Sequence, residues 1–154
     1  MPRKTYIKKS VKWSRPTAKG KKRVAGAKSL GKLKKELDGV VSRYVRQFWS
    51  KEGIVYCYTC NKPMEIKKAQ CGHFVPRQYL ATRWEFDNLR PQCMGCNVWG
   101  RGQLLDFEEN VKAELGDERV EQLKVSRNQL MRPDKAFYEQ EIARLTELLK
   151  SLTP

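Results

Sequence analysis

Two Cys-x-x-C pairs, Cys57–Cys60 and Cys93–Cys96, place the strongest constraint on how this chain can fold. Each pair presents two thiolates from one tight turn, and two such pairs can complete the closed tetrahedral sulfur site of structural Zn²⁺. Unrelated turns or redox pairs are the alternative. We favour zinc because cytoplasmic thiols stay reduced, and the ion would then hold together both ends of residues 61–92. The fifth cysteine, Cys71, is interpreted as a free, partly buried thiol.

The segment between the pairs contains the only histidine of the chain, His73, directly after Gly72. Asn88 lies in the same segment, and Asn97 follows the last cysteine, in the stretch DNLRPQCMGCN. This arrangement resembles the ββα-metal (HNH, or His-Me finger) nuclease motif with Asn as its third member. The two strands and one helix of that motif are too small to hold a core, and a zinc knuckle at the base commonly stabilises them. The resemblance therefore implies a zinc-stapled unit that hydrolyses phosphodiester bonds.

The chemistry of phosphodiester hydrolysis explains the three residue types. Deprotonating water near neutral pH suits an imidazole, whose reference pKa is about 6.5, so His73 is the expected general base. The other ring nitrogen needs an acceptor that fixes its tautomer, and the resemblance implies that Asn88 holds the loop that supplies one. Asn97 is expected to offer a carbonyl oxygen to a catalytic Mg²⁺ or Mn²⁺.

Three arginines near these residues in the chain, Arg77, Arg83 and Arg90, are candidates for clamping phosphates of the substrate. Taken singly, each could equally be a solvated surface residue. These arginines are therefore predicted DNA contacts that depend on the motif around them.

Longer stretches of the sequence carry a narrower resemblance. They cover about residues 40–130 and read CYTC, AQCGHF, LATRWEFDNLRPQCMGCN and GQLLDFEENV. They are similar to the NinG (Rap) family of phage recombination proteins, which implies a structure-specific endonuclease that cuts Holliday junctions and other branched DNA. The family often has an acidic residue three positions before the histidine, where this chain has Gln70. Gln70 can offer the metal an oxygen without charge, so we expect a lower metal affinity.

Two other functions stay open at this point. An HNH nuclease that acts on linear duplex DNA would use the same catalytic residues. A non-catalytic zinc-containing protein that binds nucleic acid would need the four cysteines, but neither Gly72–His73 nor Asn97. The presence of those residues favours a nuclease.

The positive charge of the chain is concentrated at its N-terminus. The formal net charge is +15, and residues 1–35 hold fourteen Lys and Arg residues and no Asp or Glu. Such a segment favours nucleic acid, because it neutralises phosphates and releases counterions; a solubilising tail or a membrane-surface patch is the alternative. The residues expected to contact DNA here are Lys8, Lys9, Lys21, Lys22 and Arg23. Without a membrane-spanning apolar run or a signal peptide, we expect a cytoplasmic protein with no membrane partner, in a bacterial host if phage-encoded.

The pattern of apolar residues predicts an α+β fold with four parts. They are a basic flexible arm (1–28), a helix capped by Ser29 (29–53), a zinc-bound HNH-like core with strand-like stretches at 54–56 and 73–75 (54–115), and C-terminal helices (116–154). From Gln103 onward the sequence predicts helices with apolar stripes. One stripe ends before Gly116, and a second, which includes Leu130, ends before Pro133.

Two apolar stripes could mediate a homodimer. They are Leu33, Leu37, Val41, Tyr44 and Phe48 in the first helix, and Tyr138, Ile142, Leu145, Leu149 and Leu152 in the last. A dimer is expected because a four-way junction needs two cuts and each chain has one His73. The alternative is that the last helix packs on the protein's own core or on the first helix.

Overall fold

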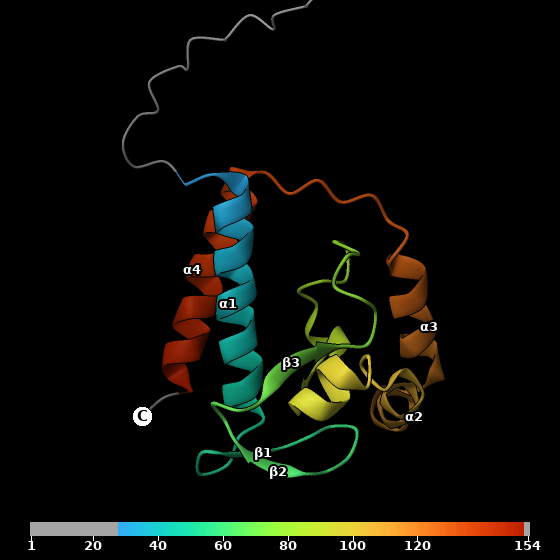
Figure 1. Ribbon diagram of the computed structural model, residues 1–154. Coiled ribbons are helices and arrows are strands. Elements are labelled where there is room, and N and C mark those ends of the chain that lie inside the picture. Colours follow the sequence, from blue (N-terminus) through green and yellow to red (C-terminus); the bar gives the residue numbers. More distant parts are fainter. Residues whose placement is uncertain (1–27, 153–154) are drawn as a thin grey trace, which may run out of the picture.

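The computed structural model describes residues 28–152, which form a mixed α+β fold (Figure 1). The elements in chain order are α1 (Leu30–Phe48), β1 (Ile54–Tyr56), β2 (Pro63–Glu65), β3 (Gln70–His73), the short helical turn η1 (Phe86–Asn88), β4 (Leu89–Gln92), the turn η2 (Gly95–Trp99), α2 (Leu104–Leu115), α3 (Asp117–Ser126) and α4 (Lys135–Ser151). The fold class agrees with the sequence prediction. The predicted DNA contacts Lys8, Lys9, Lys21, Lys22 and Arg23 lie outside the described residues.

Helix α1 begins where the sequence predicts but ends earlier. The Ser29 side chain accepts a hydrogen bond from the Lys32 backbone N–H, as an N-cap does. The helix stops at Phe48 rather than at the expected residue 53. Lys51 and Ile54 exchange backbone hydrogen bonds of 2.8 and 3.0 Å across a tight turn, in which Gly53 has φ +78°. Gly53 therefore serves the turn into β1 rather than the end of the helix.

Helices α1 and α4 lie side by side and share one apolar core (Figure 1). The buried members of this core are Leu33, Leu37, Val40, Val41, Val45, Leu89, Tyr138 and Leu145, with Ile142 packed against them. The two stripes that could have formed a dimer interface thus pack largely against each other within one chain. This is the alternative that the heptad spacing of the last helix left open.

A second core lies around α2 and α3. Its buried members are Phe74, Val75, Phe107, Val111, Val120 and Leu123. The prediction that Leu130 continues the stripe of α3 is wrong, because the helix ends at Ser126 and Leu130 is 82% exposed. Gly116, with φ +85°, separates α2 from α3 as a positive-φ glycine commonly ends a helix.

Two short antiparallel hairpins position the site between these cores. β1 pairs with β2, and β3 pairs with β4, with Gln70 opposite Gln92 and His73 opposite Leu89. The strand predicted at 73–75 instead ends at His73, because Phe74 and Val75 leave the hairpin and enter the second core. His73 consequently lies at the end of a strand, where the chain turns into the loop that leads to Asn88.

Candidate functional site

The four cysteines of the Cys-x-x-C pairs converge in the structure. Their sulfur atoms all lie within 4.8 Å of one another, and those of Cys60 and Cys93 are 3.8 Å apart. Four sulfurs placed tetrahedrally at the usual Zn–S distance of about 2.3 Å are separated from each other by about 3.8 Å. The cluster could therefore hold a metal ion of zinc size.

Backbone N–H groups already point at these sulfurs. The amide of Cys93 donates to Cys57 Sγ at 3.3 Å, and the amide of Cys96 donates to Cys93 Sγ at 3.4 Å. Burial alone would raise the pKa of Cys57, but hydrogen bonds from the Thr59 hydroxyl and from nearby backbone amides lower this pKa to about 6. Cys57 is thus prepared as a thiolate, which is the form that binds metal.

The cluster links the two hairpins. Cys57 directly follows β1, and Cys93 directly follows β4. The Tyr58 amide adds a backbone hydrogen bond of 2.8 Å to the Pro91 carbonyl, so the two strand ends are joined beside the sulfurs. A metal ion here would fix the position of the β3–β4 hairpin, which carries His73, relative to the β1–β2 hairpin.

Gly72, the residue before His73, packs closely against the buried side chain of Gln92. A Cβ atom at Gly72 would lie 2.1 Å from Gln92 Oε1, so a larger residue there would push the Gln92 side chain out of its buried position. Burial, followed by the charge of Arg83, lowers the pKa of His73 to about 4, although a hydrogen bond to the Arg83 backbone opposes this shift. His73 is therefore neutral at physiological pH, with one ring nitrogen committed to Arg83.

Asn88 holds the loop that provides this hydrogen bond. Its side chain is fully buried, and its Oδ1 accepts from the Val75 amide at 2.6 Å. Its Nδ2 donates to the carbonyls of Val75 at 3.0 Å and Thr82 at 2.9 Å. Asn88 thereby closes the loop from residue 74 to residue 87, on which Arg83 lies next to Thr82. The contribution of Asn88 to catalysis, which the motif implies, stays a prediction.

Asn97 lies in η2, a turn closed by a hydrogen bond of 2.7 Å from the Gly100 amide to the Gly95 carbonyl. This i to i+5 spacing is that of a π-helical turn, a local geometry often found at functional sites. Asn97 Nδ2 donates to Gln70 Oε1 at 2.6 Å. Both side chains line one cavity of about 300 Å³ together with His73. The structure thus brings together three of the residues that the sequence selected.

A comparison with models of protein families shows the family to which the chain belongs. A family model described as the bacteriophage lambda NinG protein matches residues 2–153, which is nearly the whole sequence. The chain belongs to the NinG family. Searches of curated proteins and of solved structures gave no match. Family membership makes this a phage-type protein and supports a role related to phage recombination. Among its described residues, no helix of this NinG-family chain is long and apolar enough to cross a membrane.

Two of the three arginines predicted to clamp phosphates have internal roles in this NinG-family chain. The Arg90 side chain is 4% exposed, forms an ion pair of 2.7 Å with Glu114, and lies over the rings of Trp49 and Tyr58. Arg83 is 7% exposed and is paired with a carboxylate. A phosphate could reach Arg90 only by displacing Glu114, whose side chain is 36% exposed, so a DNA contact of Arg90 stays a prediction.

The carboxylate that pairs with Arg83 is Asp38 of α1, a residue that the sequence did not single out. It accepts from Arg83 Nε at 2.8 Å and from Trp84 Nε1 at 2.8 Å, and it lines the same cavity as His73. Although burial acts to raise the pKa of Asp38, the hydrogen bonds from Arg83 and Trp84 bring it below its usual range. Asp38 could have been noticed in the sequence as an acidic residue directly after Leu37, which belongs to the apolar stripe of the first helix.

Arg77 differs from the other two arginines because its side chain is 70% exposed at the edge of the cavity. Its nearest acidic partner is Asp38, at 3.9 Å, and Asp38 is already occupied by Arg83. Arg77 is therefore the arginine of the three that can reach a phosphate without breaking a buried pair.

Cys71 is a free thiol on β3, partly buried against the first core. Burial raises its pKa to about 12, so it stays protonated at physiological pH. Because its thiol is protonated and its surroundings are apolar, Cys71 is a packing residue rather than a nucleophile or a metal ligand. Its structure agrees with the interpretation from sequence.

Proposed function

We propose that this NinG-family chain is a metal-dependent, structure-specific endonuclease that cuts Holliday junctions and other branched DNA. One observation carries the proposal: His73, Gln70 and Asn97 line a single cavity, while the buried Asn88 holds the loop that orients His73. Strand β3, strand β4 and the η2 turn then correspond to the two strands and the helix of a ββα-metal unit. A purely structural zinc module would need none of these four side chains.

In this proposal His73 is the general base. One ring nitrogen is held by the Arg83 backbone carbonyl, so the other remains unprotonated and can take a proton from the attacking water. The neutral state of His73 at physiological pH supports this role, because an imidazolium could not accept the proton. Arg77, exposed at the edge of the cavity, binds a phosphate oxygen of the substrate.

Asn97 and Gln70 would hold the catalytic ion through their amide oxygens. These oxygens fit a hard cation such as Mg²⁺ or Mn²⁺. Asn97 Nδ2 donates to Gln70 Oε1 at 2.6 Å, so the two amides are neighbours in the cavity, and the Asn97 amide turns to bring its oxygen to the ion. When bound, the ion supplies positive charge to the phosphate and to the leaving 3′ oxygen. Neither amide is charged, and Asp38 is neutralised by Arg83, so the site requires a high concentration of the ion.

The cysteine cluster holds a structural Zn²⁺ in this proposal. Four thiolates fill a tetrahedral site and leave no position for water or substrate. The ion therefore stabilises the hairpins and takes no part in cutting.

Cutting of branched DNA is tested with a labelled four-way junction and a matched linear duplex, each with and without Mg²⁺. We expect Mg²⁺-dependent cutting of the junction in preference to the duplex. Gln78→Ala is a suitable control, because Gln78 is an exposed residue of the same loop that does not line the cavity. Equal cutting of both substrates would favour the alternative of an HNH nuclease for linear duplex DNA. No cutting of either would favour a non-catalytic zinc protein.

The working unit in this proposal is a homodimer, since a junction needs two cuts and each chain has one His73. The contact between copies lies away from the α1–α4 core, whose apolar faces are already packed together. Light scattering on the junction complex is expected to give two chains per junction. One chain that makes both cuts would contradict this.

A further inference from the structure

A groove of about 950 Å³ leads away from the proposed catalytic cavity, and Ala69 and Gln70 line both. One wall is formed by the β1–β2 hairpin and the turn after it, and the other by the Cys93 knuckle and η2. Its volume is at the upper end of the range for ligand pockets. The proposed cutting reaction makes no use of this groove beyond the residues shared with the cavity.

The groove exposes apolar surface. Trp99 is 77% exposed, and Met94 and Ile54, which line the same groove, are 50% and 39% exposed. Exposed aromatic and apolar side chains that gather beside a site mark a contact surface. Backbone hydrogen bonds that close the η2 turn, including 2.9 Å from the Gly102 amide to the Cys96 carbonyl, fix the position from which Trp99 projects.

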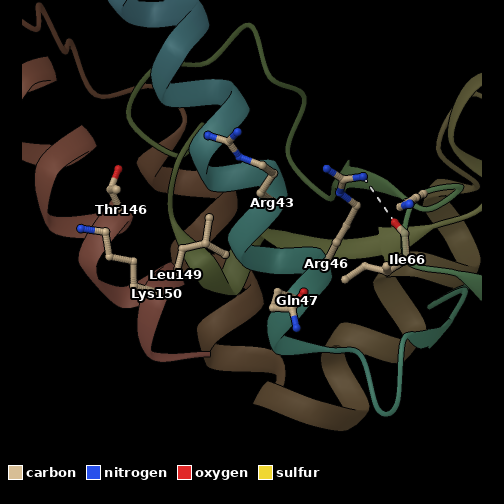
Figure 2. Close-up of a pocket in the computed structure, with 8 residues that line it drawn as sticks. Arg43, Arg46, Gln47, Ile66, Thr146, Leu149 and Lys150 are labelled. Carbon is tan, nitrogen blue, oxygen red and sulfur yellow. Dashed lines mark hydrogen bonds between the residues drawn. The ribbon is translucent and has the colours of Figure 1, made fainter. Parts of the chain in front are cut away.

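The same groove is positively charged. Lys62, Lys67 and Lys68 line it, and its one acidic lining residue among those described, Glu65, already pairs with Lys68 at 2.9 Å. Arg46 reaches across from α1 and donates to the Ile66 carbonyl at 3.3 Å (Figure 2). That bond ties the turn carrying Lys67 and Lys68 to the first core. The lysines therefore extend from a backbone that is held in place.

Positive charge continues beyond Lys67. A neighbouring hollow of about 370 Å³ lies between α1 and α4, and Lys67 lines both it and the groove. Figure 2 shows Arg43 and Arg46 of α1 and Lys150 of α4 around this hollow. A ligand that follows this surface must offer several negative charges. One that enters the groove must also offer flat apolar faces.

We propose that this groove binds an unpaired nucleotide next to the cutting site, with its base stacked on Trp99 and its phosphates on Lys62, Lys67 and Lys68. Proteins that bind single strands combine these two features, an aromatic stacking surface and a basic track for the backbone. Bases inside a duplex are stacked on each other and cannot reach the indole. The groove thus gives preference for DNA with unpaired bases at or near a branch. This inference rests on the proposed function in placing the groove beside the site of cutting.

The test measures binding rather than cutting, so that failure of the nuclease proposal and failure of this one are distinguishable. Fluorescence anisotropy of full-length Trp99→Ala is compared with wild type on a single-stranded oligonucleotide and on a paired duplex, without added Mg²⁺ and without chelator. We expect about tenfold weaker binding to the single strand, the loss typical of one base–aromatic stack, and little change for the duplex. Trp99→Phe is expected to restore most of the affinity.

Leu105→Ala is the matched control, because Leu105 is 81% exposed and lies outside the groove. A direct measurement uses wild-type protein and an oligonucleotide with one unpaired 2-aminopurine, whose fluorescence is quenched on stacking. Quenching that Trp99→Phe retains and Trp99→Ala loses is expected. No quenching with the wild type, or equal losses for single strand and duplex, would overturn the proposal. A change of oligomeric state in Trp99→Ala without a change in base-dependent binding would assign the surface to a second copy of the chain and would equally overturn it.

Discussion

Replacing Asn88 with Ala should destabilise the fold and stop cutting, because this side chain makes three buried hydrogen bonds. The substitution leaves the Val75 amide and the carbonyls of Val75 and Thr82 without their partner. An unsatisfied buried group costs about 1–3 kcal/mol, and partial access of water to the space left behind reduces the sum. We expect the free energy of unfolding to fall by roughly 3 kcal/mol.

The matched comparison is Asn97→Ala. Asn97 makes one side-chain hydrogen bond, to a partly buried Gln70 that can turn to solvent, so its loss should cost less than about 1 kcal/mol. Both variants should lose cutting, Asn88→Ala through the displaced loop and Asn97→Ala through the metal site. Urea unfolding of zinc-loaded protein, with junction cutting measured on the same preparations, separates the two effects. An Asn88→Ala protein within about 1 kcal/mol of wild type that still cuts would refute the reasoning.

Four further outcomes follow from the site and the charge distribution. Cys93→Ser should release zinc and lower the melting temperature, since metal binding and folding are coupled; a folded, zinc-free and fully active variant would contradict this. The single histidine signal in NMR should titrate near pH 4, because burial disfavours the charged ring of His73, and a midpoint at 6.5 or above would show that the ring is solvated. As the unfolded chain binds this proton more readily, stability should be lost as pH falls from about 6.5 towards 4. Deleting residues 1–28 removes eleven positive charges and should flatten the dependence of DNA binding on salt; an unchanged slope would place this segment off the DNA.

The parts of the site that depend on nearby residues could be predicted from the sequence. The cysteine cluster follows from the short spacing within each Cys-x-x-C pair. The approach of His73 to Asn97 follows from the short distance in the chain between β4, which pairs with the strand of His73, and the second cysteine pair with Asn97 after it. The Ser29 cap and the strand at 54–56 were likewise readable from local signals.

The parts that depend on distant residues could not be predicted. Arg83 and Arg90 looked available for phosphate because their partners, Asp38 and Glu114, lie 45 and 24 residues away in the chain. Apolar periodicity shows that α1 and α4 each have an apolar face to bury. The pattern is the same whether that face packs against another helix of the same chain or against a second copy of the chain. The groove beside Trp99 combines β2, the turn after it and η2, which only the folded chain brings together.

The most direct test of the central claim is to measure cutting and binding of a four-way junction by His73→Ala on one preparation. The account predicts that Mg²⁺-dependent cutting by the wild type disappears in the variant. Junction affinity should stay close to that of wild type, because binding depends mainly on phosphate contacts made elsewhere. Zinc content should also be unchanged, since His73 is not among the four sulfur ligands. Cutting that persists in His73→Ala, or that is lost only in parallel with binding, would contradict the assignment of His73 as the general base.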